Sequence, residues 1–302
     1  MHALSRFAIR SALRIADSTP RGAARVLASL GGALQYRFDR PRRTAVLANL
    51  ARMAEGGHPR LASARDRERA ARAIFVSYLR FLFEFLAQRR MTDRALCATF
   101  RFQGTELLYR ALAGGRGAVV AAPHLGNWEL AGLALARLGF RVHVVTGVQL
   151  HPALSPAVRA LKEGSGIRVS TPEDGFAPLL ATLQGGGLVV LLVDGDVYAR
   201  GLRAPFFGRE TPFPAGPAIL ARRARAPLLH AHAERLRDGR HRISIDGWDE
   251  PDRSIPLARD LARLTERVAR AQERNIAAHV TQWCIFRPFF SGPPASGTRR
   301  AA

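Results

Sequence analysis

His124 and Glu129 are the residues best suited to chemistry, and they lie in one short stretch, residues 121–130 (AAPHLGNWEL). An unperturbed histidine has a pKa of about 6.5 and can take a proton from a hydroxyl at neutral pH. A carboxylate on its other ring nitrogen fixes the tautomer and stabilises the imidazolium that forms. The same two residues also fit a simpler interpretation, a loop histidine followed by a charge at a helix start.

The flanking residues predict how the pair is positioned. The apolar run 117–122 is typical of a buried strand, and Pro123 should end it because proline cannot donate to a strand ladder. Asn127 is a suitable N-cap for the amphipathic run that follows. We therefore expect His124 on the loop at a strand's carboxyl end and Glu129 in the first helical turn, close enough to orient the ring.

A covalent mechanism is not favoured. The sequence contains no Gly-x-Ser-x-Gly motif, and neither Cys97 nor Cys284 has a histidine in a recognisable catalytic setting. We therefore interpret His124 as a base that deprotonates an acceptor hydroxyl. Two cysteines provide neither a disulfide framework nor a metal cluster, which indicates a reducing compartment.

The pattern from residue 100 onward predicts an α/β fold with a central, mostly parallel sheet flanked by helices. The most strand-like run, 188–193, ends in Asp194 and Asp196, which should open on the same sheet edge as His124. Runs 227–236 and 240–245 predict a hairpin, and 257–280 predicts an amphipathic helix. His230 and His232 would share a hairpin face, but we expect no metal site and no cofactor.

We expect three regions: a helical N-terminal region (1–95) that associates with a membrane, the α/β core (96–290) and a disordered tail (291–302). The N-terminal stretches interleave arginine with Leu and Phe, as in helices that lie in an anionic membrane surface. Neither stretch reaches the ~20 apolar residues of a spanning helix. An ordinary packed helix is the alternative.

The stretch around His124 resembles the catalytic block of the bacterial lipid A late acyltransferases, and more distantly that of the glycerolipid acyltransferases with His-x4-Asp. Further similar blocks are the Arg-rich segment ending at Asn49-Leu50, Phe206-Phe207-Gly208, Gly216-Pro217 and Gln282-Trp283. The resemblance spans roughly residues 40–290 and implies that His124 is the general base, supported by Glu129. It departs from the family at Lys162, where an arginine is usual, and around Trp283, where a proline and a second tryptophan are absent.

The resemblance implies an acyl-carrier-protein or coenzyme A thioester as acyl donor and a lipid-linked saccharide, most simply a lipid A precursor, as acceptor. An aspartate is typical at the Glu129 position in a related branch that acylates phosphatidylinositol mannosides, so that acceptor is the alternative. Backbone N–H groups near Gly126 or a basic side chain would stabilise the oxyanion. The remaining candidates for substrate binding are Asn127, Arg159, Lys162, Asp194, Asp196, Arg200, Arg203, Phe207 and Arg209.

The charge agrees with anionic partners. The 302 residues include 46 basic and 24 acidic side chains, a formal net charge of +22, and Lys162 is the single lysine. The basic residues are spread along the chain without a nucleic-acid-binding motif, so an arginine-rich protein that binds nucleic acid is disfavoured. The resemblance implies a location at the cytoplasmic face of the cell inner membrane, peripheral or anchored by the N-terminus.

Overall fold

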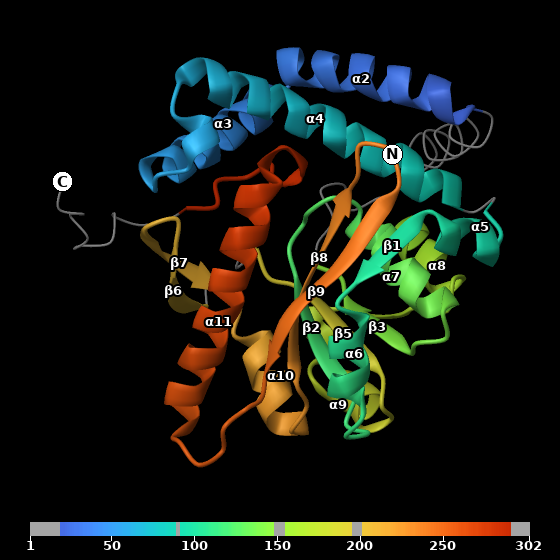
Figure 1. The fold of residues 1–302 in the computed structure, drawn as a ribbon, viewed down its shortest axis with the longest axis vertical. Coiled ribbons are helices and arrows are strands. Elements are labelled where there is room, and N and C mark those ends of the chain that lie inside the picture. The colour runs from blue at the N-terminus through green and yellow to red at the C-terminus, as the bar shows by residue number, and fades with distance from the viewer. Residues whose placement is uncertain (1–18, 89–90, 148–154, 195–200, 291–302) are drawn as a thin grey trace.

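A seven-stranded sheet forms the centre of the computed structural model, which describes residues 19–88, 91–147, 155–194 and 201–290 (Figure 1). In the described residues the strand order is β1-β9-β8-β2-β5-β3-β4. The strands are β1 (Phe100–Gln103), β2 (Ala118–Ala122), β3 (Val142–Val145), β4 (Arg168–Ser170), β5 (Leu188–Leu192), β8 (Leu228–Arg235) and β9 (His241–Asp249).

Most of the sheet is parallel. Strands β8, β2, β5, β3 and β4 run in one direction, whereas β9 pairs antiparallel with β8 and parallel with β1. The predicted fold class is therefore confirmed, as are the strand before His124 and the hairpin β8–β9. Strand β2 is buried along its whole length because helices cover both faces, which explains its continuous apolar sequence.

Helices pack on both faces of the sheet. Val119 and Ala121 of β2 face the core shared with α9, α10 and α11, while Val120 faces the opposite core, which includes α6. The α7 residues Leu130 and Leu133 pack in a further core with β3. The helices are α5 (Asp93–Ala98), α6 (Thr105–Leu112), α7 (Trp128–Arg137), α8 (Ser155–Glu163), α9 (Ala177–Gln184), α10 (Gly216–Ala224) and α11 (Leu257–Ala278).

The helices α2 (Arg21–Phe38), α3 (Arg40–Glu55) and α4 (Ala64–Ala87) lie across one end of the sheet (Figure 1). They share a hydrophobic core with Leu125, Trp283 and the hairpin β6 (Leu202–Phe206)–β7 (Arg209–Phe213). This hairpin is not predicted from the sequence, because both of its strands contain proline and arginine, which are typical of loops. No helix among the described residues is long and apolar enough to cross a membrane.

The loop that carries His124 is fixed to two other segments. Cys284 N–H donates to the carbonyl of His124 at 2.9 Å, and Gly126 N–H donates to the carbonyl of Gln282 at 3.2 Å. Gly126 has φ +61°, and a Cβ added there would lie 2.4 Å from the carbonyl oxygen of Ala233 in β8. Only glycine therefore lets the loop rest on β8 at this distance.

Replacing Gly126 by alanine should lower the free energy of unfolding by roughly 3 kcal/mol, from left-handed strain plus the contact with the Ala233 backbone. Gly139→Ala is the matched control, since Gly139 also has a positive φ (+92°) but has open space around it. It should cost only about 1 kcal/mol. Urea unfolding of both variants measures the difference, and equal losses would contradict this role of Gly126.

Candidate active site

His124 and Asp194 form the centre of the candidate site. They follow the neighbouring parallel strands β2 and β5, whose last residues Ala122 and Leu192 are register partners. Each side chain stands two residues beyond its strand end, so the two meet at one sheet edge. His124 Nδ1 lies 2.7 Å from Asp194 Oδ1, and the His124 backbone N–H donates to Asp194 Oδ2 at 2.7 Å.

This arrangement corrects the prediction that Glu129 orients His124. Asp194 holds Nδ1, which leaves Nε2 as the nitrogen that can accept a proton, in the way a buried aspartate orients a catalytic histidine. The expectation that Asp194 and His124 open on the same edge is confirmed. The prediction that Asp194 binds substrate is not confirmed, because its side chain is fully buried and pairs with His124.

Asp194 remains ionised in its buried position. Burial alone would raise its pKa, but the charge of His124 and hydrogen bonds from His124 and Trp283 hold the pKa of Asp194 below its usual value. Trp283 Nε1 donates to Asp194 Oδ2 at 2.8 Å. The sequence analysis identifies Trp283 only through the family resemblance and gives it no hydrogen-bond role.

Aromatic rings fix the plane of the base. Trp128, the first residue of α7, packs edge-on against His124 with ring centroids 5.0 Å apart, and Phe81 of α4 stacks on Trp128 at 4.2 Å. The His124 side chain is still 32% exposed. Within the described part of the chain, no hydrogen bond to Nε2 is found.

Asn127 supports the loop and does not face a ligand. Its Oδ1 accepts from Leu130 N–H, which caps α7, and its Nδ2 donates to Glu84 Oε2 of α4 at 2.9 Å. Glu84 also forms a two-point ion pair with Arg235 of β8. Because Asn127 is fully buried, the structure gives it a positioning role in place of the predicted contact with substrate.

Glu129 pairs with Lys162. Glu129 Oε1 and Lys162 Nζ are 2.9 Å apart, and Lys162 is buried. Both line an apolar cavity of about 80 Å³ between α7 and the sheet, together with Pro123 and Trp128, which flank the His124 loop. The rest of its lining is mainly apolar, apart from His232, and includes Val120, Ala131, Leu135, Val144, Ile167, Val190, Leu192, Ala231, Ala233 and Ile243.

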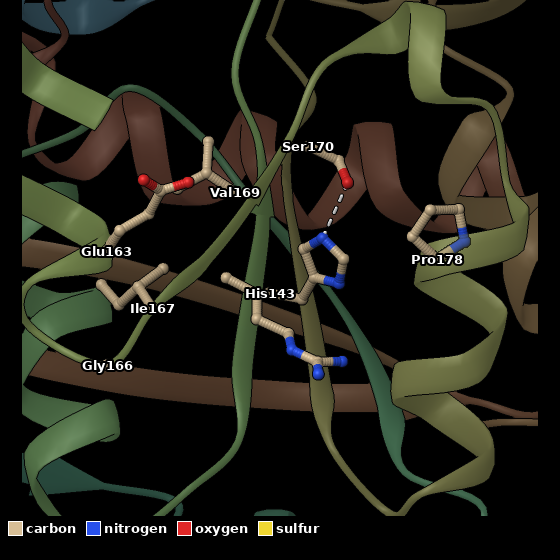
Figure 2. A pocket seen from close by; sticks show the side chains of 8 residues that line it. His143, Glu163, Gly166, Ile167, Val169, Ser170 and Pro178 are labelled. Atoms are coloured by element: carbon tan, nitrogen blue, oxygen red, sulfur yellow. Dashed lines mark hydrogen bonds between the residues drawn. The ribbon is translucent and has the colours of Figure 1, made fainter. Parts of the chain in front are cut away.

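A second hollow, of about 500 Å³, lies at the β4 edge of the sheet and has a mixed polar and apolar lining (Figure 2). His143 lies in its wall, and Figure 2 shows the hydrogen bond from its ring to Ser170. The other ring nitrogen contacts Thr182 Oγ1 at 2.8 Å, and burial lowers the pKa of His143. Both ring nitrogens of His143 thus form hydrogen bonds with hydroxyl groups. This hollow is larger than the cavity beside α7, but its histidine has no ring nitrogen left for a substrate.

The other predicted substrate contacts are dispersed. Arg159 is half-exposed and pairs with Glu163, while Arg203 donates to the carbonyl of Glu210 in its own hairpin. Arg209 is buried against Glu55 of α3, at 2.6 Å. Phe207 is part of the hydrophobic core, so it is not open to a ligand. Asp196 and Arg200 lie outside the described residues.

Two sources of oxyanion stabilisation are predicted: backbone N–H groups near Gly126 and a basic side chain. The N–H groups of His124, Leu125 and Gly126 already donate to Asp194, Pro123 and Gln282, respectively. These three N–H groups are therefore already engaged. Lys162 is the basic side chain that remains beside the cavity.

The site thus combines a histidine paired with a buried aspartate and, lined by the adjacent Pro123 and Trp128, an apolar cavity. Residues 3–291 match the family described as bacterial lipid A biosynthesis acyltransferase. The chain belongs to this family, and it is an O-acyltransferase. The suspected resemblance is thereby confirmed.

Curated relatives carry a related name. A phosphatidylinositol mannoside acyltransferase of Mycobacterium tuberculosis (strain CDC 1551 / Oshkosh) is 31% identical over 221 residues, which are 70% of this chain and 67% of the relative. The protein of that name from strain ATCC 25618 / H37Rv is 32% identical, over 61% of this chain and 58% of its own length. The protein of that name from Mycolicibacterium smegmatis is 29% identical, over 72% of this chain and 71% of its own length.

Replacing Asp194 by asparagine should lower kcat by roughly 10³–10⁴-fold while the fold is kept, because the amide can neither stabilise the imidazolium nor fix the tautomer. Glu129→Gln is the matched comparison, since it also removes one carboxylate charge within the same site. Its loss should be about tenfold or less. Steady-state rates with circular dichroism as a folding check distinguish the two, and a larger loss for Glu129→Gln would contradict the assignment of Asp194.

Proposed function

We propose that this protein transfers a fatty acyl group from a thioester, carried by acyl-carrier protein or coenzyme A, to a hydroxyl of a lipid-linked saccharide. The observation that carries the proposal is the Asp194–His124 pair, whose neighbours Pro123 and Trp128 line an apolar cavity. The net charge of +22 suits a phosphorylated donor and acceptor.

The reaction follows from these positions. His124 Nε2 takes the proton of the acceptor hydroxyl as its oxygen attacks the thioester carbonyl, and Asp194 stabilises the resulting imidazolium. Lys162 supplies positive charge to the oxyanion of the tetrahedral intermediate, and Glu129 holds Lys162 in place. The intermediate then collapses, the ester remains on the acceptor, and the thiol of the carrier leaves with the proton from His124.

The apolar cavity suits the proximal part of the acyl chain. Its walls come mainly from β2, β3, β5, β8, β9 and α7, and its ionisable side chains are Glu129, Lys162 and His232. A chain inserted there would be shielded from water while its carbonyl stays near the charged groups. The size of the side chains lining the cavity would then influence which acyl lengths are accepted.

A lipid A precursor is the first candidate acceptor, because the family match spans nearly the whole chain. A phosphatidylinositol mannoside is the second candidate, favoured by the names of the curated relatives. Both are anionic glycolipids with free sugar hydroxyls, so the same base serves either.

The test combines two thioester donors with the two acceptors. Purified protein is incubated with acyl-carrier-protein or coenzyme A thioesters and each glycolipid, and mass spectrometry identifies the product. Transfer by the wild-type protein should fall at least 10³-fold in His124→Ala. Retained transfer at a near wild-type rate would remove His124 from the mechanism.

His143→Asn is the control in this assay. His143 is another buried histidine, and it lies in the larger hollow (Figure 2). It should retain the activity of the wild-type protein provided that its melting temperature shows a folded chain. If His143→Asn were inactive and His124→Ala active, the reaction would have to be placed in the other hollow.

The proposed acceptor is a lipid held in a membrane, and we infer that α2 is the surface of the protein that contacts this membrane. Large apolar side chains stand exposed along α2, at spacings that place most of them on one helical face: Val26, Leu27, Leu30, Leu34 and Phe38. Arg25 and Arg37 belong to the same helix. An exposed apolar stripe with arginine beside it fits a helix lying in an anionic membrane surface. This agrees with a membrane-associating N-terminal region, at the cytoplasmic face of the inner membrane.

Leu30→Glu should reduce binding to anionic phospholipid vesicles several-fold, because it places a charge at the apolar side of α2. Leu257→Glu is the matched control, since Leu257 is as exposed as Leu30 (59% each) but begins α11. Vesicle co-sedimentation measures both. Equal binding by the two variants would mean that α2 is not the membrane-facing surface.

A further inference from the structure

Three side chains outside the proposed catalytic pair come together at the C-terminal end of α11. His232 and Glu234 lie on the same face of β8, and His279 is the residue that ends α11. One potential ligand atom from each lies within 4.8 Å of the others. Figure 1 shows this end of α11 near the end of the sheet where the β8–β9 turn lies.

The His232 ring is already oriented as metal-bound histidines usually are. Its Nδ1 pairs with Asp246 Oδ2 at 2.9 Å, and the same oxygen accepts from Asn275 of α11 at 2.8 Å. A carboxylate on one imidazole nitrogen fixes the tautomer and leaves the other nitrogen unprotonated for a metal. Asp246 is ionised, since its hydrogen bonds with His232 and Asn275 hold its pKa low in spite of burial.

Glu234 and His279 form the other half of the cluster. His279 Nδ1 lies 3.0 Å from Glu234 Oε2, and the His232 and His279 rings are stacked with centroids 5.7 Å apart. Glu234 Oε1 is taken by Arg242 at 2.9 Å, so Oε2 is the oxygen that remains for a cation. A metal ion would replace the proton now shared between Glu234 and His279.

The surrounding charges permit a divalent cation. Glu234 and Asp246 provide two negative charges, against the positive charges of Arg242 and Arg60 near His279. Arg60 is directed at the carbonyls of Ala277 and Ala278. His232 and Glu234 are buried, while His279 is partly exposed and provides a route of entry from solvent.

We propose that His232, Glu234 and His279 bind a divalent transition-metal ion of the Zn²⁺ type, which joins the end of α11 to β8. Two imidazoles and one carboxylate are a common ligand set for Zn²⁺, with water as the fourth ligand. Tetrahedral ligand atoms around Zn²⁺ are about 3.4 Å apart, so side-chain movements of about 1 Å close the site.

The proposed ion would act on the candidate active site through the chain that follows His279. The short helix η5 (Val280–Gln282) leads directly to Trp283, the donor to Asp194. Fixing His279 to β8 therefore fixes the segment that holds the acid partner of His124. The ion has a structural role, and its ligand His232 also lines the apolar cavity.

The test uses the full chain without an affinity tag, stripped with a chelator and equilibrated with a small excess of ZnCl₂. Elemental analysis should find about one zinc ion per wild-type chain, and zinc should raise the melting temperature by on the order of 5 °C. His279→Asn and Glu234→Gln should each weaken zinc binding at least tenfold and lose the thermal shift.

His230→Asn is the matched control. His230 lies on the same face of β8, is buried to the same extent and also pairs with an aspartate, Asp249, but is not one of the three ligands. It should bind zinc like the wild-type protein. The proposal is overturned if the wild-type chain binds no zinc, or if the ligand variants and His230→Asn bind it equally. Either result would mean that the cluster consists of hydrogen-bonded pairs alone.

Discussion

The pairing of β2 with β5 is the constraint on which the rest of the site depends. Parallel register aligns Ala122 with Leu192, so the residues two positions further on, His124 and Asp194, are brought into hydrogen-bonding contact. Neither strand needs a special sequence for this, only an apolar run that helices can cover on both faces. The site therefore arises from the topology of the sheet as much as from the motif around His124.

The buried charge of Asp194 depends on the elements around it. A carboxylate without partners would be costly at this depth, but it accepts hydrogen bonds from His124 and from Trp283. The His124 loop is supported in turn by Asn127, which contacts Glu84 and through it Arg235. Nearby, burial lowers the pKa of His241 to about 4, so this histidine stays neutral beside Glu84. The reactive ring thus rests on a polar network that joins α4, α7 and β8.

Much of this could be predicted from local sequence. The alternation of strands and helices predicted the sheet. Pro123 marked the end of β2 and Asn127 the start of α7. The aspartates after the 188–193 run indicated that they share a sheet edge with His124. The partner of His124 was assigned incorrectly, because Glu129 is near in sequence whereas Asp194 is near only once β2 and β5 are registered. The lysine partner of Glu129 and the tryptophan donor to Asp194 are long-range contacts of the same kind. The β6–β7 hairpin was missed since both of its short strands contain proline and arginine, which are typical of loops.

The hydrogen bond from Trp283 has a consequence for how the protein matures. The sheet and its helices draw on residues up to 278, but the donor to Asp194 and the contacts of Cys284 and Gln282 with the His124 loop come afterwards in the chain. A nascent polypeptide on the ribosome therefore assembles most of its core before residues 282–284 emerge. The Asp194 carboxylate and the His124 loop gain these hydrogen bonds only after that point.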